Sequence, residues 1–333
     1  MKKIMLNLAE PAYPLPKFVQ KELCEFLGKV HRLPRNYHEL EKAIAGEFHV
    51  HRDNVLLANG ADEAIDLIAR AFGKKTLVFT PSYLEYALAP KRNGFAVERA
   101  NALHGKEYSI DPRESKAKKA TLIFLANPSN PFGCTERKKT EELIHNSGGV
   151  VAVDETHLWF SRKRKSLAPL VRKHGNLLVF GSFSKVFSLA GMRIGYIIAG
   201  KKLLRRIKGK ALCFNVSALS VQAALLGLKH KKHFKKKAER TAKERKKFEG
   251  WLEERGFNVF HTENNNAVIK FPSVEEAGAF VKRLEKRGIL VLQGNGISTL
   301  GLSNAFVRIT IGNAEEMRAV REAISEIFPK SGI

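Results

Sequence analysis

A lysine between two serines is the residue in this sequence with the clearest chemical potential. Lys185 lies in the segment GSFSKVFSLAGMRIGY, with Ser182 and Ser184 on either side and Arg193 eight residues later. A lysine held away from water loses its proton more readily and can attack a carbonyl to form a Schiff base. Hydroxyl groups and a forked guanidinium are donors that hold phosphate. The segment therefore predicts a site for a molecule that carries an aldehyde and a phosphate.

Two further segments supply groups that suit the same kind of molecule. Ala61 and Asp62 open a predicted helix, and the free N–H groups at a helix N-terminus bind phosphate. Asp154 ends an apolar run, where a carboxylate is costly unless it has a partner. A protonated pyridine nitrogen is such a partner, and the pair keeps the ring an electron sink. Aldehyde, phosphate and pyridine together indicate pyridoxal 5'-phosphate.

Two other residues fit this site but have ordinary structural explanations as well. Asn127, in ANPSNP, would donate to the phenolic oxygen of the cofactor, although an asparagine before proline also forms turns. Tyr83, in TPSY, would stack on the ring, although a half-buried aromatic near a strand end is common. Their order along the chain, each after an apolar run, favours the functional interpretation.

Short apolar runs must position these residues. The runs are residues 55–58, 76–79, 121–126, 150–153, 177–180 and 196–199. They are nearly continuous in hydrophobicity, which is typical of strands buried on both faces of a mostly parallel α/β sheet. Ligands bind at the carboxyl ends of such strands, where the polar residues lie.

The pattern changes near residue 217, where a long helical stretch begins that reaches Arg255. Shorter strands follow, in NVFHT, AVIKF, ILVLQ and FVRITIG, with helices near 274–287 and 313–327. We expect a large domain over residues 30–220 and a smaller α+β domain built from residues 1–29 and 221–333.

Eight pieces of the sequence, taken in order, resemble a known family. They are LNLAEPAYPLP, NGADEAIDLIARAF, TPSYLEY, ANPSNPFG, VVAVDETHLWF, SFSKVFSLAGMRIGY, FNVSALSVQAAL and FVRITIG. Together they resemble the fold-type I, pyridoxal-phosphate-dependent aminotransferases, and most of all the histidinol-phosphate aminotransferase branch. The resemblance implies transfer of an amino group from histidinol phosphate, or a related amine or amino acid, to a 2-oxo acid such as 2-oxoglutarate. It also implies a homodimer.

The resemblance assigns roles to the matching positions. Lys185 would bond the cofactor and move the proton, Asp154 would pair with the pyridinium, and Arg308 would hold the anionic group of the substrate. Asn127 would bond the phenolic oxygen and Tyr83 would stack on the ring. The residues implied for the cofactor phosphate are Ala61, Asp62, Ser182, Ser184 and Arg193.

The sequence departs from the family at three positions. His157 stands where the family usually has a tyrosine that bonds the phenolic oxygen, and a neutral imidazole can also donate one hydrogen bond. Leu33 replaces a tyrosine that reaches the cofactor phosphate of the partner subunit. Leu292 and Gln293 replace an arginine that grips the substrate phosphate in this branch. The cofactor match is therefore firmer than the substrate match.

Three alternative functions stay open at this stage. A threonine-phosphate decarboxylase shares most of these motifs, and so does a transaminase for aromatic or other amino acids. The third alternative is a polyanion-binding module on this fold, because the 333-residue chain has a net charge of +25. Much of that charge lies in residues 229–247, which we interpret as an exposed helical face. Nucleic acid is not expected as the primary ligand, since no nucleic-acid-binding motif is present.

Composition sets the remaining expectations. No apolar run approaches the roughly 20 residues that span a bilayer, so we expect no membrane association and a cytoplasmic location. The three cysteines are far apart, and the histidines form no set with ligand spacing, so no metal site is expected.

Overall fold

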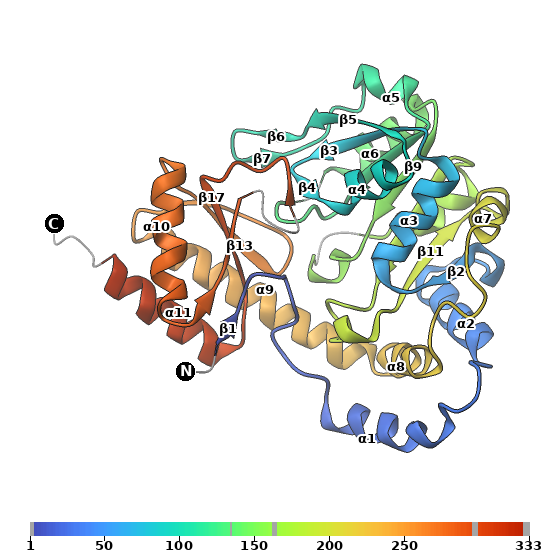
Figure 1. The fold of residues 1–333 in the computed structure, drawn as a ribbon, viewed down its shortest axis with the longest axis horizontal. Helices are drawn as coiled ribbons and strands as arrows, with labels where there is room; N and C mark the ends of the chain where they lie inside the picture. The colour runs from blue at the N-terminus through green and yellow to red at the C-terminus, as the bar shows by residue number, and fades with distance from the viewer. Residues whose placement is uncertain (1–2, 134, 162–164, 295–298, 329–333) are drawn as a thin grey trace.

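A seven-stranded sheet forms the centre of the larger unit (Figure 1). The computed structural model describes residues 3–133, 135–161, 165–294 and 299–328. The strands lie in the order β2 (Val55–Ala58), β11 (Gly195–Ala199), β10 (Leu177–Ser182), β9 (Val150–Asp154), β8 (Leu122–Ala126), β3 (Lys75–Thr80) and β5 (Ala96–Asn101). All neighbours pair in parallel except β11, which is antiparallel to both β10 and β2. The mostly parallel α/β sheet is confirmed, with all six predicted strands. The strand β5 escaped prediction because its polar, mostly exposed residues interrupt any apolar run.

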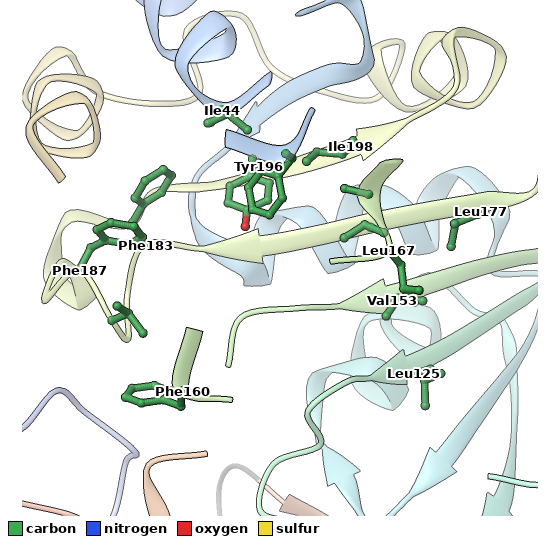
Figure 2. Packing of buried hydrophobic residues seen from close by; sticks show 14 of the residues in the cluster. Ile44, Leu125, Val153, Phe160, Leu167, Leu177, Phe183, Phe187, Tyr196 and Ile198 are labelled. Atoms are coloured by element: carbon green, nitrogen blue, oxygen red, sulfur yellow. The ribbon is translucent and has the colours of Figure 1, made fainter. Parts of the chain in front are cut away.

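Alternate residues of the central strands supply two separate cores. Leu125 of β8 lies opposite Val153 of β9, and both point into one core (Figure 2). Their neighbours Phe124 and Ala152 point into the core on the other face. Because side chains alternate along a strand, a sheet covered on both faces needs apolar residues at every position. This explains the continuous apolar runs of the sequence.

Helices cover both faces of this sheet. One face carries α3 (Gly60–Phe72), α4 (Glu85–Arg92) and α7 (Lys201–Lys208). The other carries α1 (Lys17–Phe26), α2 (Tyr37–Phe48), α6 (Arg137–Asn146) and α8 (Ala218–Lys229), with the short α5 (Ser115–Lys119) near its edge. Two short strand pairs complete this unit: β6 (Leu103–His104) with β7 (Glu107–Tyr108), and β4 (Ser82–Tyr83) with β16 (Thr299–Leu300).

The smaller unit is an antiparallel sheet with helices against it. Its strands lie in the order β12 (Asn258–Phe260), β13 (Asn266–Lys270), β17 (Phe306–Thr310) and β15 (Leu292–Gln293). The helices are α10 (Val274–Glu285), α11 (Ala314–Ile327) and the end of α9 (Lys231–Glu253), which runs from the larger unit to the smaller one (Figure 1). A capping box between Asn313 and Glu316 fixes the start of α11. The predicted α+β character of this region is confirmed.

Two predicted elements were wrong in their extent. The helical stretch from 217 to 255 is two helices, because the backbone of His230 departs from helical geometry (ψ 23°) between α8 and α9. The stretch ILVLQ is not one strand: β14 (Ile289–Leu290) pairs with the N-terminal β1 (Ile4–Met5), whereas β15 pairs with β17. The two halves of ILVLQ therefore pair in two different sheets.

The division of the chain into domains stays a proposal. Leu6, Phe248 and Ile309 belong to the core of the smaller unit. Val19 of α1 and Val221 of α8 lie instead in a core of the large sheet, although they fall outside residues 30–220. Within the described residues, no helix is both long and apolar enough to cross a membrane.

Candidate active site

A cavity of about 400 Å³ lies at the carboxyl ends of the central strands. The strands β2, β3, β8, β9 and β10 run the same way, so the loops that follow them meet at one edge of the sheet. The cavity brings together nine of the residues predicted for the site: Ala61, Asp62, Tyr83, Asp154, His157, Ser182, Ser184, Lys185 and Arg193.

One corner of the cavity gathers hydrogen-bond donors around Asp62. Its carboxylate accepts bonds from Arg193 Nη2 at 2.6 Å and from the Tyr83 hydroxyl at 2.9 Å. Arg193 has a left-handed backbone (φ 47°), a strained conformation that is common at functional sites. Its guanidinium lies directly over Gly60, where a Cβ would come within 2.7 Å of Nη2. The Arg193 guanidinium therefore packs against the start of α3, and only a glycine at position 60 leaves room for it.

Two serine hydroxyls complete this corner. Ser182 donates to the Ser184 hydroxyl at 2.6 Å, and the Ser184 amide donates to Ser182 Oγ at 2.9 Å. Both side chains are buried at the cavity wall, at the end of β10. With the N-terminus of α3, they form a surface that presents hydroxyl and N–H donors to an anion.

Asp154 lies at the end of β9 and is buried in the lining of the same cavity. Burial raises the pKa of Asp154, and hydrogen bonds from Thr156 and Tyr86 oppose that shift. The Thr156 amide donates to Oδ1 at 2.7 Å and the Tyr86 hydroxyl to Oδ2 at 2.6 Å. Tyr86 was not among the predicted site residues. It lies in α4, three residues after Tyr83 of β4, and the second tyrosine of TPSYLEY was the available signal.

Lys185 is half-buried and lines the same cavity. Burial lowers its pKa to about 8, and the positive charge of Arg308 adds to this shift. Its Nζ donates to the carbonyl oxygen of Leu8 at 3.2 Å, so the N-terminal segment covers the lysine. Burial also lowers the pKa of His157 to about 3, which makes its imidazole neutral at physiological pH. Within the described chain, His157 Nδ1 is buried without a hydrogen-bond partner and so is available to a bound group.

The structure separates the two asparagines of NPSNP. Asn127 donates from Nδ2 to the Thr135 carbonyl at 3.3 Å and does not line the cavity. Asn130 does line it, and its Oδ1 accepts a bond from Arg308 Nη1 at 3.1 Å. Arg308 is only 1% exposed, and its Nη2 donates to the Asn7 carbonyl at 2.6 Å. The predicted anion-binding arginine therefore reaches the cavity through Asn130, which the sequence analysis did not single out.

Three consecutive buried asparagines hold these parts in place. Asn264 donates from Nδ2 to the carbonyls of Ser129 and Phe132, in the loop after β8. Asn265 donates to the Ala9 carbonyl at 3.1 Å, and Asn266 donates to Asn130 Oδ1 at 3.4 Å. The triplet thus ties the smaller unit both to the N-terminal segment and to the cavity wall. It was missed because the sequence NNN has no periodicity and is typical of a surface turn.

Beside Asp154 lies a second buried acid that does not face the cavity. Glu155 accepts a bond from the Leu167 amide at 2.7 Å and one from the Ser166 hydroxyl at 2.5 Å. Burial nevertheless raises its pKa to about 7, because those hydrogen bonds offset only part of the cost of desolvation. The folded protein therefore takes up a proton at Glu155 at a pH where the unfolded chain has lost it.

This shift predicts a pH-dependent stability. Because the pKa of Glu155 is raised in the folded state, its stabilising contribution is complete below pH about 4.5 and is lost as the pH rises through 7. Relative to Glu155→Gln, the wild type should lose about 3 kcal/mol of unfolding free energy across that range. Urea denaturation at several pH values measures it, with the exposed Glu285→Gln as control. Parallel pH profiles for wild type and Glu155→Gln would contradict the assignment.

The groups around the cavity fit pyridoxal phosphate. The lining of one cavity supplies hydroxyl and guanidinium donors for an anion, a buried carboxyl and a lysine of lowered pKa. The unpartnered His157 Nδ1 offers one more contact to a polar ring substituent. No other described residue is needed to match the aldehyde, phosphate and pyridine of this cofactor.

Comparison with known proteins identifies the family. The family model for aminotransferase class I and II matches residues 2–324. A histidinol-phosphate aminotransferase from Brachyspira hyodysenteriae is 30% identical over 333 residues, which cover 98% of this chain and 92% of the relative.

Two solved structures have the same fold along nearly the whole chain. The histidinol-phosphate aminotransferase from Sinorhizobium meliloti in complex with pyridoxal-5'-phosphate has a TM-score of 0.89 at 19% identity, covering 98% of this chain and 91% of that one. L-threonine-O-3-phosphate decarboxylase from Porphyromonas gingivalis has a TM-score of 0.85 at 21% identity, covering 97% and 99%. The chain therefore belongs to the class I and II aminotransferases, which confirms the predicted fold, enzyme class and pyridoxal phosphate cofactor.

Proposed function

We propose that this aminotransferase moves the amino group of histidinol phosphate, or of a closely related phosphorylated amine, to a 2-oxo acid such as 2-oxoglutarate. The observation that carries the proposal is the likeness, over 98% of the chain, to a relative named for that donor. The placement of Arg308 supports it, because a buried guanidinium next to Lys185 favours an amine that also carries an anionic group.

The corner at the start of α3 would hold the cofactor phosphate. Its donors are the N–H groups at the N-terminus of α3, the two serine hydroxyls and the Arg193 guanidinium. Asp62 orients that guanidinium through its bond of 2.6 Å. The residues assigned to the phosphate are Ala61, Asp62, Ser182, Ser184 and Arg193.

The remaining walls would hold the ring. Asp154 would pair with the ring nitrogen, since a cationic partner lowers the cost of a buried carboxylate. Tyr83 would lie on the ring face, and His157 would donate from its neutral imidazole to the phenolic oxygen. For the second bond to that oxygen, the geometry favours Asn130 over Asn127, because only Asn130 lines the cavity.

Lys185 would carry out the proton transfers. Bound pyridoxal phosphate supplies an aldehyde for the lysine amine and a ring that withdraws electrons from the adjacent carbon. With a pKa of about 8, the Lys185 amine is neutral in a useful fraction of molecules near neutral pH. It would take the proton from the amine-bearing carbon of the donor and return it during the second half-reaction. In the net reaction the donor carbon is oxidised to a carbonyl, and the carbonyl carbon of the 2-oxo acid is reduced to an amine.

The test is product formation from a small panel of donors. Histidinol phosphate with 2-oxoglutarate should yield glutamate at a kcat/KM at least about a hundredfold above that of phenylalanine or tyrosine, because each good charge-assisted contact contributes 1.5–3 kcal/mol. Threonine phosphate should release no carbon dioxide.

Other outcomes would indicate that the protein is a different enzyme of the same fold. Carbon dioxide from threonine phosphate would favour the decarboxylase, as the similarity to the Porphyromonas gingivalis structure permits. Preference for an aromatic amino acid would favour a transaminase of that class, consistent with Leu292 and Gln293 in place of a second arginine.

We also propose that the protein forms a homodimer. Two segments expose large apolar side chains: Leu27, Val30 and Leu33 before α2, and Leu212 and Phe214 before α8. Tyr37 joins the segments, because its ring lies 6.5 Å from that of Phe214 and its hydroxyl bonds to the Val216 backbone. Exposed apolar groups gathered in this way are typical of an interface. Sedimentation should give twice the chain mass of 37.3 kDa, and a monomer would contradict the proposal.

A further inference from the structure

One face of α9 carries a stripe of cations that the aminotransferase reaction does not use. Its members are Lys232, Lys236, Arg240, Lys243 and Lys247, all of them exposed. At about 100° per residue they fall within an arc of about 80°, and at 1.5 Å per residue they span about 22 Å. We call these five residues the α9 stripe. Cations lined up along one side of a helix form a surface that attracts a linear polyanion.

The cations of the α9 stripe are not neutralised by the protein. Within the described residues, none of the five lies within 4 Å of a carboxylate. Glu244 and Glu249 pair away from the stripe with Arg321 and Arg245, whereas the exposed Glu239 lies at the edge of the stripe and leaves a net excess of four positive charges along it. The charge is therefore available to a partner, and the chain as a whole adds to it with a net charge of +25.

The opposite face of α9 is fully used by the fold. Phe234, Ala238, Phe248 and Leu252 are each at most 3% exposed and pack into the protein core. An amphipathic helix that inserts into a membrane interface buries an apolar face beside its charges. Because α9 has no such face to offer, its stripe suits a partner that is recognised by charge alone.

We propose that the α9 stripe binds the phosphate backbone of duplex nucleic acid. A duplex carries one phosphate per about 1.7 Å of its axis when both strands are counted, so a segment as long as the stripe carries about 13 phosphates on its two strands. Binding of single strands usually needs aromatic rings on which bases stack. Phe234 is the only Phe, Tyr or Trp between Lys232 and Lys247, and it is buried. The contact is therefore with the backbone and independent of sequence.

The proposal predicts the salt dependence of binding. Fluorescence anisotropy with a labelled DNA duplex of about 20 base pairs measures the affinity between about 50 and 200 mM salt. If all five cations contact phosphates, the slope of log K against log salt should be about −4.5. The triple variant Lys236→Glu, Arg240→Glu, Lys243→Glu should lower the affinity at least about tenfold and reduce the slope to about −2 or less.

A matched control separates the stripe from bulk charge. Lys91→Glu, Lys118→Glu, Lys138→Glu changes the net charge by the same amount at exposed lysines of α4, α5 and α6. It should bind the duplex nearly as well as the wild type. Equal losses in the two triple variants would overturn the proposal, because binding would then follow net charge alone.

The same measurements test the class of partner. Vesicles that contain phosphatidylserine, and polyglutamate, serve as the competing anions; tighter binding of either than of the duplex would overturn the assignment to nucleic acid. Both triple variants should keep aminotransferase activity, since none of the six positions lines the cavity. Failure of duplex binding is therefore distinguishable from failure of the proposed reaction.

Discussion

The Lys185→Ala variant should lose at least about 10⁴-fold in the rate of amino transfer. The variant lacks the amine that we propose bonds the cofactor and moves the proton, and general base catalysis alone contributes up to about 10⁴. No other lysine lines the cavity within the described residues, so no neighbour can take over the role. The measurement is single-turnover conversion of donor by the protein loaded with pyridoxal phosphate.

A nearby lysine provides the control for this variant. Lys237 also has a pKa lowered by burial, and its Nζ donates to the Pro14 carbonyl at 2.9 Å, much as Lys185 donates to Leu8. Lys237→Ala should keep most of the activity. Lys185→Ala should still retain the cofactor through its phosphate contacts, with an absorbance like that of free pyridoxal phosphate. If the variant kept both activity and the spectrum of the wild type, Lys185 would not be the catalytic base.

Replacing Arg308 with alanine should have the second largest effect. Removing one member of a buried, charge-assisted hydrogen bond costs about 2–5 kcal/mol, which corresponds to roughly 30- to several-thousand-fold in kcat/KM. Burial lowers the pKa of Arg308 to about 10, so the guanidinium is still charged at pH 7. The loss should fall mainly on KM, for the phosphorylated donor or the 2-oxo acid, because the anionic group is held in the ground state as well.

Two further variants separate binding from folding. Arg308→Lys keeps the charge but loses the fork that reaches both Asn130 and Asn7, so it should recover only part of the loss. Arg321→Ala removes an arginine from the smaller unit, paired with Glu244 at 2.6 Å, and should leave KM unchanged. An unchanged KM in a folded Arg308→Ala protein would show that another group binds the anion.

The sequence predicted the part of the site that strand topology determines. Asp154, Ser182 and Lys185 lie within five residues of the ends of apolar runs, and the loops that follow parallel strands meet at the same edge of the sheet. The local sequence pattern was sufficient to predict those residues, because the strand determines where the residue lies and the residue type determines which chemistry it can perform.

The local sequence pattern could not identify site residues whose role depends on the direction in which the side chain points. Asn127 and Asn130 are both followed by proline, and only the fold shows that Asn130 points into the cavity. Tyr86 and the asparagines at 264–266 act through contacts with residues distant in the chain. Such contacts leave no periodic signal. The break at His230 was missed for a similar reason, since the residues on both sides of it favour helix.

The contacts of the N-terminal segment bear on the order in which the parts of the site come together during folding. Asn7 accepts the bond from Arg308, a contact 301 residues apart in sequence, and Leu8 covers Lys185. Residues 7–10 have nowhere to dock until Arg308 and the asparagine triplet, far later in the chain, have also been made. Contacts of such high sequence separation form late, because the loop between them must close first. A chain that lacks Arg308 therefore lacks one of the partners that hold this segment over Lys185.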